Sequence, residues 1–411
     1  MDFMLNNVHR VDAAGETKGH LGVVDGLFNY KTTTKQKSNL VSFDVGEDYF
    51  VYPGFINAHD HLLGNYFPRV GKGPYLNWLP WDNDLKTAKV YQERGKLTAY
   101  ETYFLGSLRH LLSGVTWVSD HIPHAVNNKY INHLPVNVLG KYTLAHECSS
   151  YDLKWGDPIP EHAIAKKENI PFITHIEEGF DEEAKKGVDY LKAWGILDEY
   201  TVMIHGVSLS EQDIKDIAKE KAHLVWCPTS NVFMYDVTAD VRSWLRNQVN
   251  VSLGTDSPMS GSQNLLEEIA YAQHIYQKMY NEKLDGRTLF NMITVNPAKA
   301  LRIPAGKLSE GMPANFVVTR KILDNPFENI LKLKLSDISL VVVNGKPVYG
   351  DFHFSPLLKK LNLQHWKVEV EGTDKFLAVR GSLKLLKKIK NLLGYAKYIP
   401  FLPINILSQK D

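Results

Sequence analysis

Between residues 52 and 303 the chain alternates short apolar runs with longer amphipathic stretches. The apolar runs are bounded by turn-forming residues and are rich in β-branched and aromatic side chains, which is typical of buried parallel strands. The predicted strands are YPGFINAH (52–59), GVTWVSD (114–120), VNVLGKYTLAH (136–146), PFITHIEE (171–178), YTVMIHG (200–206), AHLVWCP (222–228) and VNVSLGTD (249–256). Amphipathic helical patterns lie between them, so the pattern predicts an α/β fold, and this number of strands favours a (β/α)8 barrel of the TIM type over an open sheet.

The segments on either side of this region have a different pattern. Residues 1–51 contain HLGVVDGLFNY and LVSFDVGEDYF, and residues 304–351 contain GKLSEGMPANFVVTR and LVVVNGKPVYG. Short alternating stretches separated by Gly, Asp and Asn indicate β-strands and turns. We therefore expect residues 1–51 and 304–351 to form one small β-domain beside a barrel of residues 52–303.

Residues 352–411 are predicted to form a helical, basic extension. In GSLKLLKKIKNLLGYAKY the apolar residues fall on one helical stripe, and no acidic residue occurs between Lys375 and Lys410. One interpretation is a basic helix that contacts an anionic membrane surface. The other, which we favour, is a terminal helix that packs on its own barrel or on a second subunit, with its lysines in water.

Composition narrows the class of protein. The 411 residues are 44% hydrophobic and 23% charged, and the net charge of +1 does not favour a nucleic-acid partner. Two cysteines, Cys148 and Cys227, are too few for a disulfide framework. The start MDFMLNNVHRVD shows no secretory signal, and no apolar run is long enough to span a bilayer. We expect a cytoplasmic protein with a small-molecule substrate.

Side chains that bind metals or transfer protons follow the predicted strands. His59 and His61 are two residues apart in a strand, so both rings point to one face and can offer a nitrogen to one ion. Active groups of parallel barrels lie at the carboxyl ends of the strands. Those ends carry His59 with His61, Asp120 with His121, His146, His175 with Glu178, His205, and Asp256. A metal site explains this set better than separate structural histidines do.

Five stretches resemble the amidohydrolase superfamily, and they occur in the family's order: PGFINAHDH, FITHIEE, VMIHG, VWCPTSN and LGTDSP. The most similar branch is the cytosine-deaminase-like and chlorohydrolase-like one, which includes deaminases of adenosylhomocysteine and related purines. The resemblance covers residues 1–350 and implies a (β/α)8 barrel with a small β-sandwich domain built from both chain flanks. It also implies one divalent ion per chain, zinc in the first place and iron in the second.

The resemblance assigns the metal ligands. His59 and His61 match the metal pair of the first strand, and His175 matches the third histidine ligand. Asp256 matches the aspartate that contacts the metal and takes a proton from the attacking water. A divalent ion lowers the pKa of bound water from 15.7 to about 7, which gives a nucleophile at neutral pH.

The resemblance also assigns groups that act on the substrate. His205 matches the histidine that hydrogen-bonds the attacking water, and Glu178, in the HxxE motif, matches the acid that protonates the leaving side. His146 resembles a substrate-contacting histidine of these deaminases. Adjacent Glu177 points to the opposite side of a continued strand, so we interpret it as structural.

Two further residues are candidate substrate contacts. Purine-ribose deaminases of this branch have a glutamate near YLNWLPW that binds the sugar, and Asn77 stands there in this chain. His121, in DHIPH, has no counterpart in the family pattern, and pocket lining and an ordinary loop position are equally open for it.

The chain departs from the family between Asp120 and His146, where relatives have a longer excursion. We expect one barrel unit to be trimmed or replaced by a loop, which would open that side of the mouth. Lys141 compares with the carboxylated lysine of binuclear members, but the HxxE motif is typical of the mononuclear branch. We therefore interpret Lys141 as an ordinary lysine at a strand edge, and the departures as signs of a changed substrate.

The predicted function is metal-dependent hydrolytic deamination of an amino-substituted nitrogen heterocycle. One alternative on the same site is hydrolysis of an amide or of another C–N or C–Cl bond. Another is a non-catalytic relative that keeps the barrel as a scaffold for partners, but this predicts broken ligand positions, and all of them are intact. The resemblance also implies a homo-oligomer.

Overall fold

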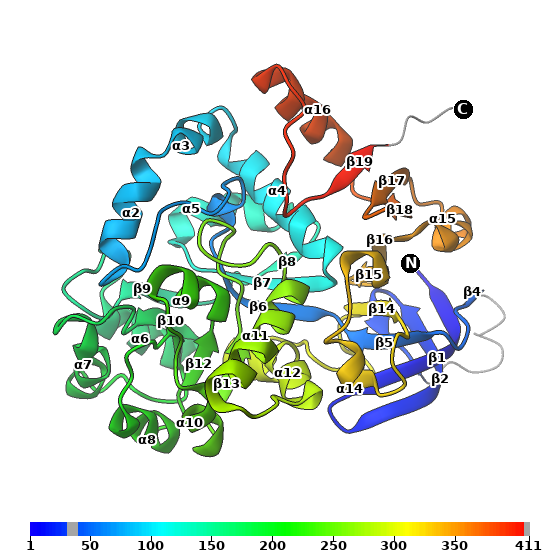
Figure 1. Ribbon diagram of the computed structural model, residues 1–411. Coiled ribbons are helices and arrows are strands. Elements are labelled where there is room, and N and C mark those ends of the chain that lie inside the picture. The colour runs from blue at the N-terminus through cyan, green and yellow to red at the C-terminus, as the bar shows by residue number, and fades with distance from the viewer. Residues whose placement is uncertain (31–39, 407–411) are drawn as a thin grey trace.

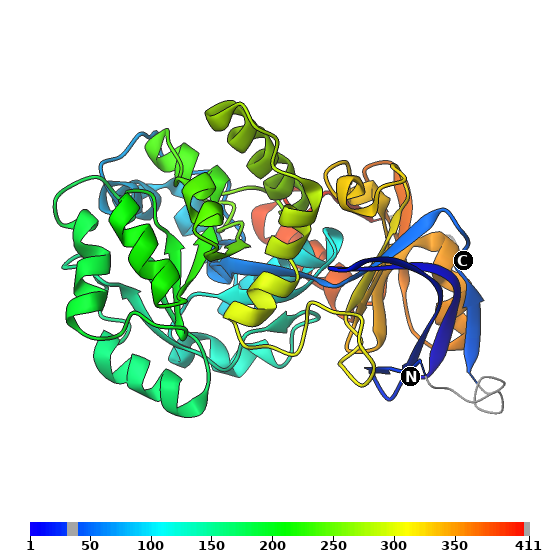
Figure 2. The ribbon, with the colours of Figure 1, turned by 90° about the horizontal axis from the view of Figure 1, so that it is seen from below.

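The computed structural model describes residues 1–30 and 40–406. Figures 1 and 2 show two parts side by side: helices surround the green and cyan strands in one, and blue, gold and orange strands from both ends of the chain make up the other. One hydrophobic core lies mainly in the helical part, and another, which includes Phe3, Phe316 and Phe376, lies in the strand-rich part.

The helical part contains eight strands that pair only in parallel. They form two sheets, of order β6-β7-β8 and β13-β12-β11-β10-β9. The strands are β6 (Phe55–Asp60), β7 (Val115–Asp120), β8 (Asn137–Val138), β9 (Thr143–Glu147), β10 (Phe172–Ile176), β11 (Thr201–His205), β12 (His223–Trp226) and β13 (Asn250–Leu253). The mixed α/β class and the parallel strands agree with the sequence-based prediction.

Helices connect these strands and cover them. They are α2 (Trp78–Thr87), α3 (Lys89–Arg94), α4 (Ala99–Leu112), α5 (His124–Ile131), α6 (Pro158–Glu168), α7 (Gly187–Ala193), α8 (Glu211–Lys219), α9 (Pro228–Tyr235), α10 (Val241–Arg246), α11 (Leu265–Tyr280), α12 (Gly286–Met292) and α13 (Val295–Ala300). Short 3-10 helices are η1 (Leu62–Gly64) and η2 (Ala184–Lys186). Local sequence sets several boundaries: Thr98 with Glu101 and Ser210 with Asp213 form capping boxes at the starts of α4 and α8.

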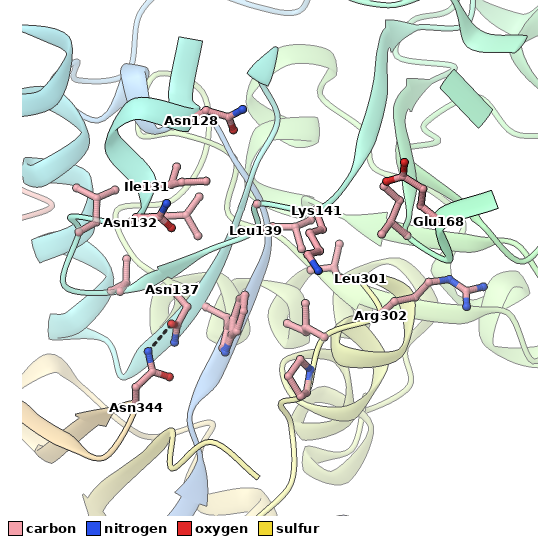
Figure 3. Close-up of a pocket in the computed structure, with 18 of the residues that line it drawn as sticks. Asn128, Ile131, Asn132, Asn137, Leu139, Lys141, Glu168, Leu301, Arg302 and Asn344 are labelled. Carbon is pink, nitrogen blue, oxygen red and sulfur yellow. Dashed lines mark hydrogen bonds between the residues drawn. The ribbon is translucent and has the colours of Figure 1, made fainter. Parts of the chain in front are cut away.

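The stretch 136–146, predicted as one strand, is two. β8 and β9 are joined by residues 139–142 without a helix, and no ladder between them occurs in the described chain. A cavity of about 1000 Å³ lies beside this connection, lined by residues that include Trp117, Lys141, Arg302 and Asn344 (Figure 3). The predicted metal ligands are not among its lining residues, so the shortened unit leaves space away from the histidine cluster.

The strand-rich part is one sheet of eleven strands in the described chain. Its strands are β1 (Phe3–Asp12), β2 (Gly15–Val24), β3 (Leu27–Phe28), β4 (Val41–Asp44), β5 (Tyr49–Pro53), β14 (Phe316–Arg320), β15 (Ile338–Val343), β16 (Lys346–Asp351), β17 (Trp366–Val370), β18 (Thr373–Leu377) and β19 (Ile404–Ile406). The flanks meet where β5 pairs antiparallel with β14, and β5 continues almost directly into β6. Also in this part are η3 (Leu335–Asp337), η4 (Phe352–Phe354) and α14 (Pro326–Asn329).

The extension predicted as helical over 352–411 contains strands as well as helices in its described part, residues 352–406. Besides α15 (Ser355–Lys360) and α16 (Ser382–Leu393), this segment contributes β17, β18 and β19 to the large sheet. The short run WKVEV alternates and is followed by Glu371 and Gly372, which both have positive φ and allow a tight hairpin turn.

Helix α16 packs on the helical part of its own chain. Leu385 and Ile389 are buried, and Lys388 Nζ lies 2.5 Å from Glu101 Oε1 of α4. This agrees with the packing interpretation that we favoured. Among the described residues, none of the helices combines the length and apolar character needed to cross a membrane.

Candidate active site

The predicted ligand side chains converge at the carboxyl ends of the strands. His59 lies near the end of β6, with His61 just beyond it, His175 lies in β10 and His205 ends β11, while Asp256 follows β13. Three groups each have ligand atoms within 4.8 Å of one another: His59, His61 and His175; His59, His205 and Asp256; and His175, Glu178 and His205. Residues separated by up to 197 positions in the chain are thus brought to one point.

Hydrogen bonds orient three of the imidazoles. Nδ1 of His61 donates to the carbonyl of His121 (3.1 Å), and Nδ1 of His175 donates to the carbonyl of His146 (2.8 Å). Nδ1 of His205 donates to Asn231 Oδ1 at 2.8 Å. Because each Nδ1 carries the proton, each Nε2 keeps its lone pair for a ligand or an acceptor role.

His59 is the most isolated of these side chains. It is fully buried, and neither ring nitrogen has a hydrogen-bond partner among residues 1–30 and 40–406. Burial, reinforced by the neighbouring His61, His205 and His121, lowers the pKa of His59 well below its ordinary value. A neutral imidazole with an unsatisfied buried nitrogen fits a metal ligand, because the ion supplies the missing partner.

Three neighbouring groups hydrogen-bond the carboxylate of Asp256. Its Oδ2 accepts from the hydroxyls of Ser230 (2.8 Å) and Ser260 (2.6 Å), and its Oδ1 accepts from the backbone of Ser257 at 2.7 Å. Oδ1 also lies 3.9 Å from Nε2 of both His59 and His61. The hydroxyls occupy one oxygen and leave the other toward the histidines.

Two of the site residues have strained backbones. His205 has φ +73° and Asp256 has φ +53°, in the left-handed region that residues other than glycine rarely adopt. Such strain costs about 1–3 kcal/mol per residue and is concentrated at functional sites. It turns both side chains out of the strand direction at the point where the strands end.

Glu178 follows His175 and lies beside His205. Its Oε1 is 3.6 Å from His205 Nε2 and accepts a hydrogen bond from the Tyr235 hydroxyl at 3.1 Å. Burial, and then the charge of Asp256, raise the pKa of Glu178 to about 8. A carboxyl group with this pKa carries its proton at neutral pH and can donate it.

A buried ion pair connects the loops that carry the ligands. Asp60, between His59 and His61, lies 2.6 Å from Arg109 of α4. The same guanidinium donates to the carbonyls of Ser262 (2.8 Å) and Gln263 (2.6 Å), which follow Asp256 in the chain. Arg109 therefore fixes the end of β6 against the loop after β13.

A cavity of about 300 Å³ opens onto this cluster. It includes six predicted site residues in its lining: His61, His146, His175, Glu178, His205 and Asp256. Aromatic and apolar side chains make up much of the remaining wall, including Trp78, Trp81, Trp155, Phe67 and Met259. Such a cavity suits a flat, partly apolar ligand.

Two candidate substrate contacts, Asn77 and His121, do not line this cavity. Asn77 is outside the cavity lining, because its side chain caps α2 by accepting from Leu79 N (3.0 Å) and donates to Asp181 (2.6 Å). His121 is fully buried behind the cluster, with its ring 4.4 Å from that of His175 and its Nε2 3.0 Å from the Ala145 carbonyl. His121 thus contributes its carbonyl to orient His61 and does not line the cavity.

Sequence reasoning missed several residues around the cluster. Trp78 neighbours Asn77, packs edge-on against His146 at 4.7 Å and donates to Glu147 at 2.8 Å. Tyr235 and Ser260 lie after VWCPTSN and LGTDSP, and nothing in their spacing distinguishes them from loop residues. Ser230 lies within VWCPTSN, and its place in that motif was the one feature of the sequence that could have indicated a role in the site.

Comparison with known proteins identifies relatives of the chain. Residues 141–348, half of the chain, match the amidohydrolase family. A 5-methylthioadenosine/S-adenosylhomocysteine deaminase of Thermoanaerobacter pseudethanolicus is 29% identical over 355 residues, which are 72% of this chain and 80% of that protein. A 5'-deoxyadenosine deaminase of Methanocaldococcus jannaschii is 27% identical over 346 residues, covering 70% of this chain and 79% of that protein.

Solved structures share the fold. A zinc-bound adenosine deaminase from Xanthomonas campestris superposes with a TM-score of 0.73 at 15% identity, covering 96% of this chain and 98% of that one. These similarities confirm the predicted resemblance and the prediction of a metal-dependent hydrolase with deaminases as relatives. The chain belongs to the amidohydrolase family.

Proposed function

We propose that this protein hydrolytically deaminates the amino-substituted ring of an adenine nucleoside. The observation that carries the proposal is the convergence of His59, His61, His175 and Asp256 beside a protonated Glu178. The names of the relatives, which are deaminases of adenosine-like compounds, support this choice of ring.

His59, His61, His175 and Asp256 are the residues that would hold one divalent ion, zinc or, as the second choice, iron. The support is chemical: three imidazoles and one carboxylate are a donor set that zinc prefers, and His59 has two unsatisfied nitrogens. When bound, such an ion supplies positive charge that lowers the pKa of water from 15.7 to about 7.

Asp256 and His205 act on the attacking water. Asp256 Oδ1 is the base, since Oδ2 is occupied by two serine hydroxyls. Asn231 fixes the proton of His205 on Nδ1. The unprotonated Nε2 therefore accepts a hydrogen bond from the attacking water. The two groups direct the oxygen toward the ring carbon that bears the amino group.

Glu178 acts on the leaving side. Its carboxyl proton passes to the substrate nitrogen, so that ammonia leaves in place of an amide ion. The Tyr235 hydroxyl donates to Glu178 Oε1 and keeps this side chain in position. The walls formed by Trp78 and Trp155 suit the flat purine, and His146 between them contacts it.

We further propose that the eight parallel strands close into a (β/α)8 barrel over residues 52–303, with residues 1–51 and 304–351 as the β-sandwich domain. The hydrogen bond from Asp256 N to the His59 carbonyl (3.1 Å) supports closure, because it links the end of the last strand to the first. The expected homo-oligomer stays a prediction.

The test is release of ammonia by zinc-loaded protein from adenosine, 5'-deoxyadenosine and 5'-methylthioadenosine. The proposal expects turnover of at least one of these nucleosides, with loss of the adenine absorbance as the ring is converted to hypoxanthine. Loaded, folded protein that deaminates none of them would contradict the proposal.

A further inference from the structure

Arg94 brings a positive charge to the wall of the catalytic cavity. It is the last residue of α3 and lines the cavity together with Tyr91, Leu85 and Trp81. Its Nε atom is buried without a hydrogen-bond partner, and its side chain forms no hydrogen bond or ion pair within the described ranges 1–30 and 40–406.

Two acidic residues near Arg94, one in the lining of the cavity and one adjacent in the chain, are paired with other cations. Asp82, which also lines the cavity, is 2.5 Å from Lys86 Nζ. Glu93 binds Lys397 and accepts from the Tyr395 hydroxyl (3.4 Å), both in the C-terminal segment. It also accepts from the hydroxyl of Tyr66 (2.5 Å), in the loop after β6. The guanidinium of Arg94 therefore has no carboxylate of its own, although it is permanently charged and partly buried.

The segment that carries Arg94 is firmly held. Lys397 Nζ lies 4.2 Å above the ring of Tyr66 while it binds Glu93, so the C-terminal segment, α3 and the loop after β6 meet at one cluster. Because these contacts hold α3 in place, Arg94 at its end presents its charge at a fixed position on the cavity wall. Preorganised charge of this kind is used to bind ligands.

The geometry points to Arg94 as an anion subsite: the substrate of this enzyme carries a carboxylate or phosphate on the part that lies away from the reacting amino group. The inference rests on the proposed function, since it assigns the amino-bearing ring to the Glu178 and Asp256 end of the cavity. The cavity lining supports it, because Arg94 shares that lining with Glu178 and Asp256 and is the lining cation that no carboxylate of the described chain pairs. An anionic group of the ligand would pair with the Arg94 guanidinium, for which the described chain provides no carboxylate.

One neutral and two anionic substrates test the inference. 5'-Methylthioadenosine and its 5'-carboxymethylthio analogue differ by one carboxylate, and adenosine 5'-phosphate gives the phosphate arm. We expect Arg94→Gln to lower the ratio of kcat/KM for an anionic substrate to kcat/KM for the neutral one by about 10- to 100-fold. Arg94→Lys, which keeps the charge, should restore part of this ratio, and the arm with the larger loss identifies the anion.

Lys96→Gln is the matched control, because Lys96 is exposed, lies two residues away and does not line the cavity. It should leave the ratio unchanged. An equal ratio in wild type and Arg94→Gln would overturn the subsite and reduce Arg94 to a hydrated residue of the wall.

A binding measurement separates this inference from the proposed function. Trp78, Trp81 and Trp155 line the cavity, so quenching of tryptophan fluorescence reports occupancy without turnover. If no nucleoside is deaminated, the proposed function fails, but weaker binding of the carboxylated nucleoside by Arg94→Gln would still support the subsite. Equal binding by wild type and variant would overturn it.

Discussion

Glu178 Oε1 lies 3.6 Å from His205 Nε2, and the two side chains face the same cavity from neighbouring strands. The carboxyl group is protonated near neutral pH, and the imidazole is neutral because burial lowers its pKa. In the proposed mechanism Glu178 gives a proton to the leaving group, and His205 forms a hydrogen bond with the attacking water.

The proposed role of Glu178 as the acid predicts the effect of Glu178→Gln. The amide cannot supply a proton, so kcat should fall by about a hundred- to ten-thousandfold. KM should change little, because glutamine keeps the shape of the side chain. Glu177→Gln is the matched control, since Glu177 accepts from Val188 N at 3.2 Å outside the cavity and should retain activity. Equal losses in both variants would contradict the assignment.

The pH profile follows from the same group. The acid acts only in its protonated form, so kcat/KM should decrease as the pH rises through the pKa of Glu178, about 8 in the metal-free protein. A divalent ion nearby lowers that pKa by its charge, and the alkaline limb should therefore lie at or below pH 8. The profile of Glu178→Gln should lack this limb. A limb that survives in the variant would belong to another group.

Removal of Arg109 should be costly. Arg109→Met removes the guanidinium from fully buried Asp60 and leaves it with His110 (3.1 Å) and Asn65 (3.0 Å), and loss of one partner of a buried ion pair typically costs about 3–5 kcal/mol in the free energy of unfolding. Urea unfolding of the two proteins measures this difference. Lys192→Met removes an exposed ion pair with Asp216 and should change stability little. Similar stability of the Arg109 variant and wild type would contradict the role of this bridge between the ligand loops.

The C-terminal segment should influence substrate choice through α3. Lys397→Met removes the cation that holds Glu93 and releases that carboxylate toward its neighbour Arg94. We expect the preference for an anionic over a neutral substrate to fall several-fold, with unchanged secondary structure by circular dichroism. Lys390→Met, on the exposed face of α16, is the control. A preference that is identical in all three proteins would show that Glu93 and the tail do not affect the cavity.

Much of this architecture could be predicted from the sequence because parallel strands leave a strong signal. The runs that end at His175, His205 and Asp256 are apolar on both faces, and their positions along the chain fix the order in which the ligands meet. Side chains that serve the ligands were harder to predict. Ser260 contacts Asp256 through a loop whose path no periodicity reveals.

Local roles and missed boundaries have physical causes as well. The substrate contact expected of Asn77, within YLNWLPW, stays a prediction, and in the structure its side chain caps α2 by accepting from a free backbone N–H group. The C-terminal strands were missed because WKVEV is short and lies among lysine-rich helical patterns. The break between β8 and β9 was missed because the β-prone residues on both sides of Gly140 and Lys141 were interpreted as one strand.

The central claim is that His59, His61, His175 and Asp256 hold one divalent ion. Metal content by mass spectrometry tests it on wild type, on His59→Ala/His61→Ala, and on His175→Gln in case the buried pair is needed for folding. His133→Ala, an exposed histidine away from the cluster, is the control. We predict close to one zinc or iron per chain in wild type and control, and loss of the ion in the folded ligand variants. Folded wild-type protein that holds no more metal than these variants, even after reconstitution, would contradict the account.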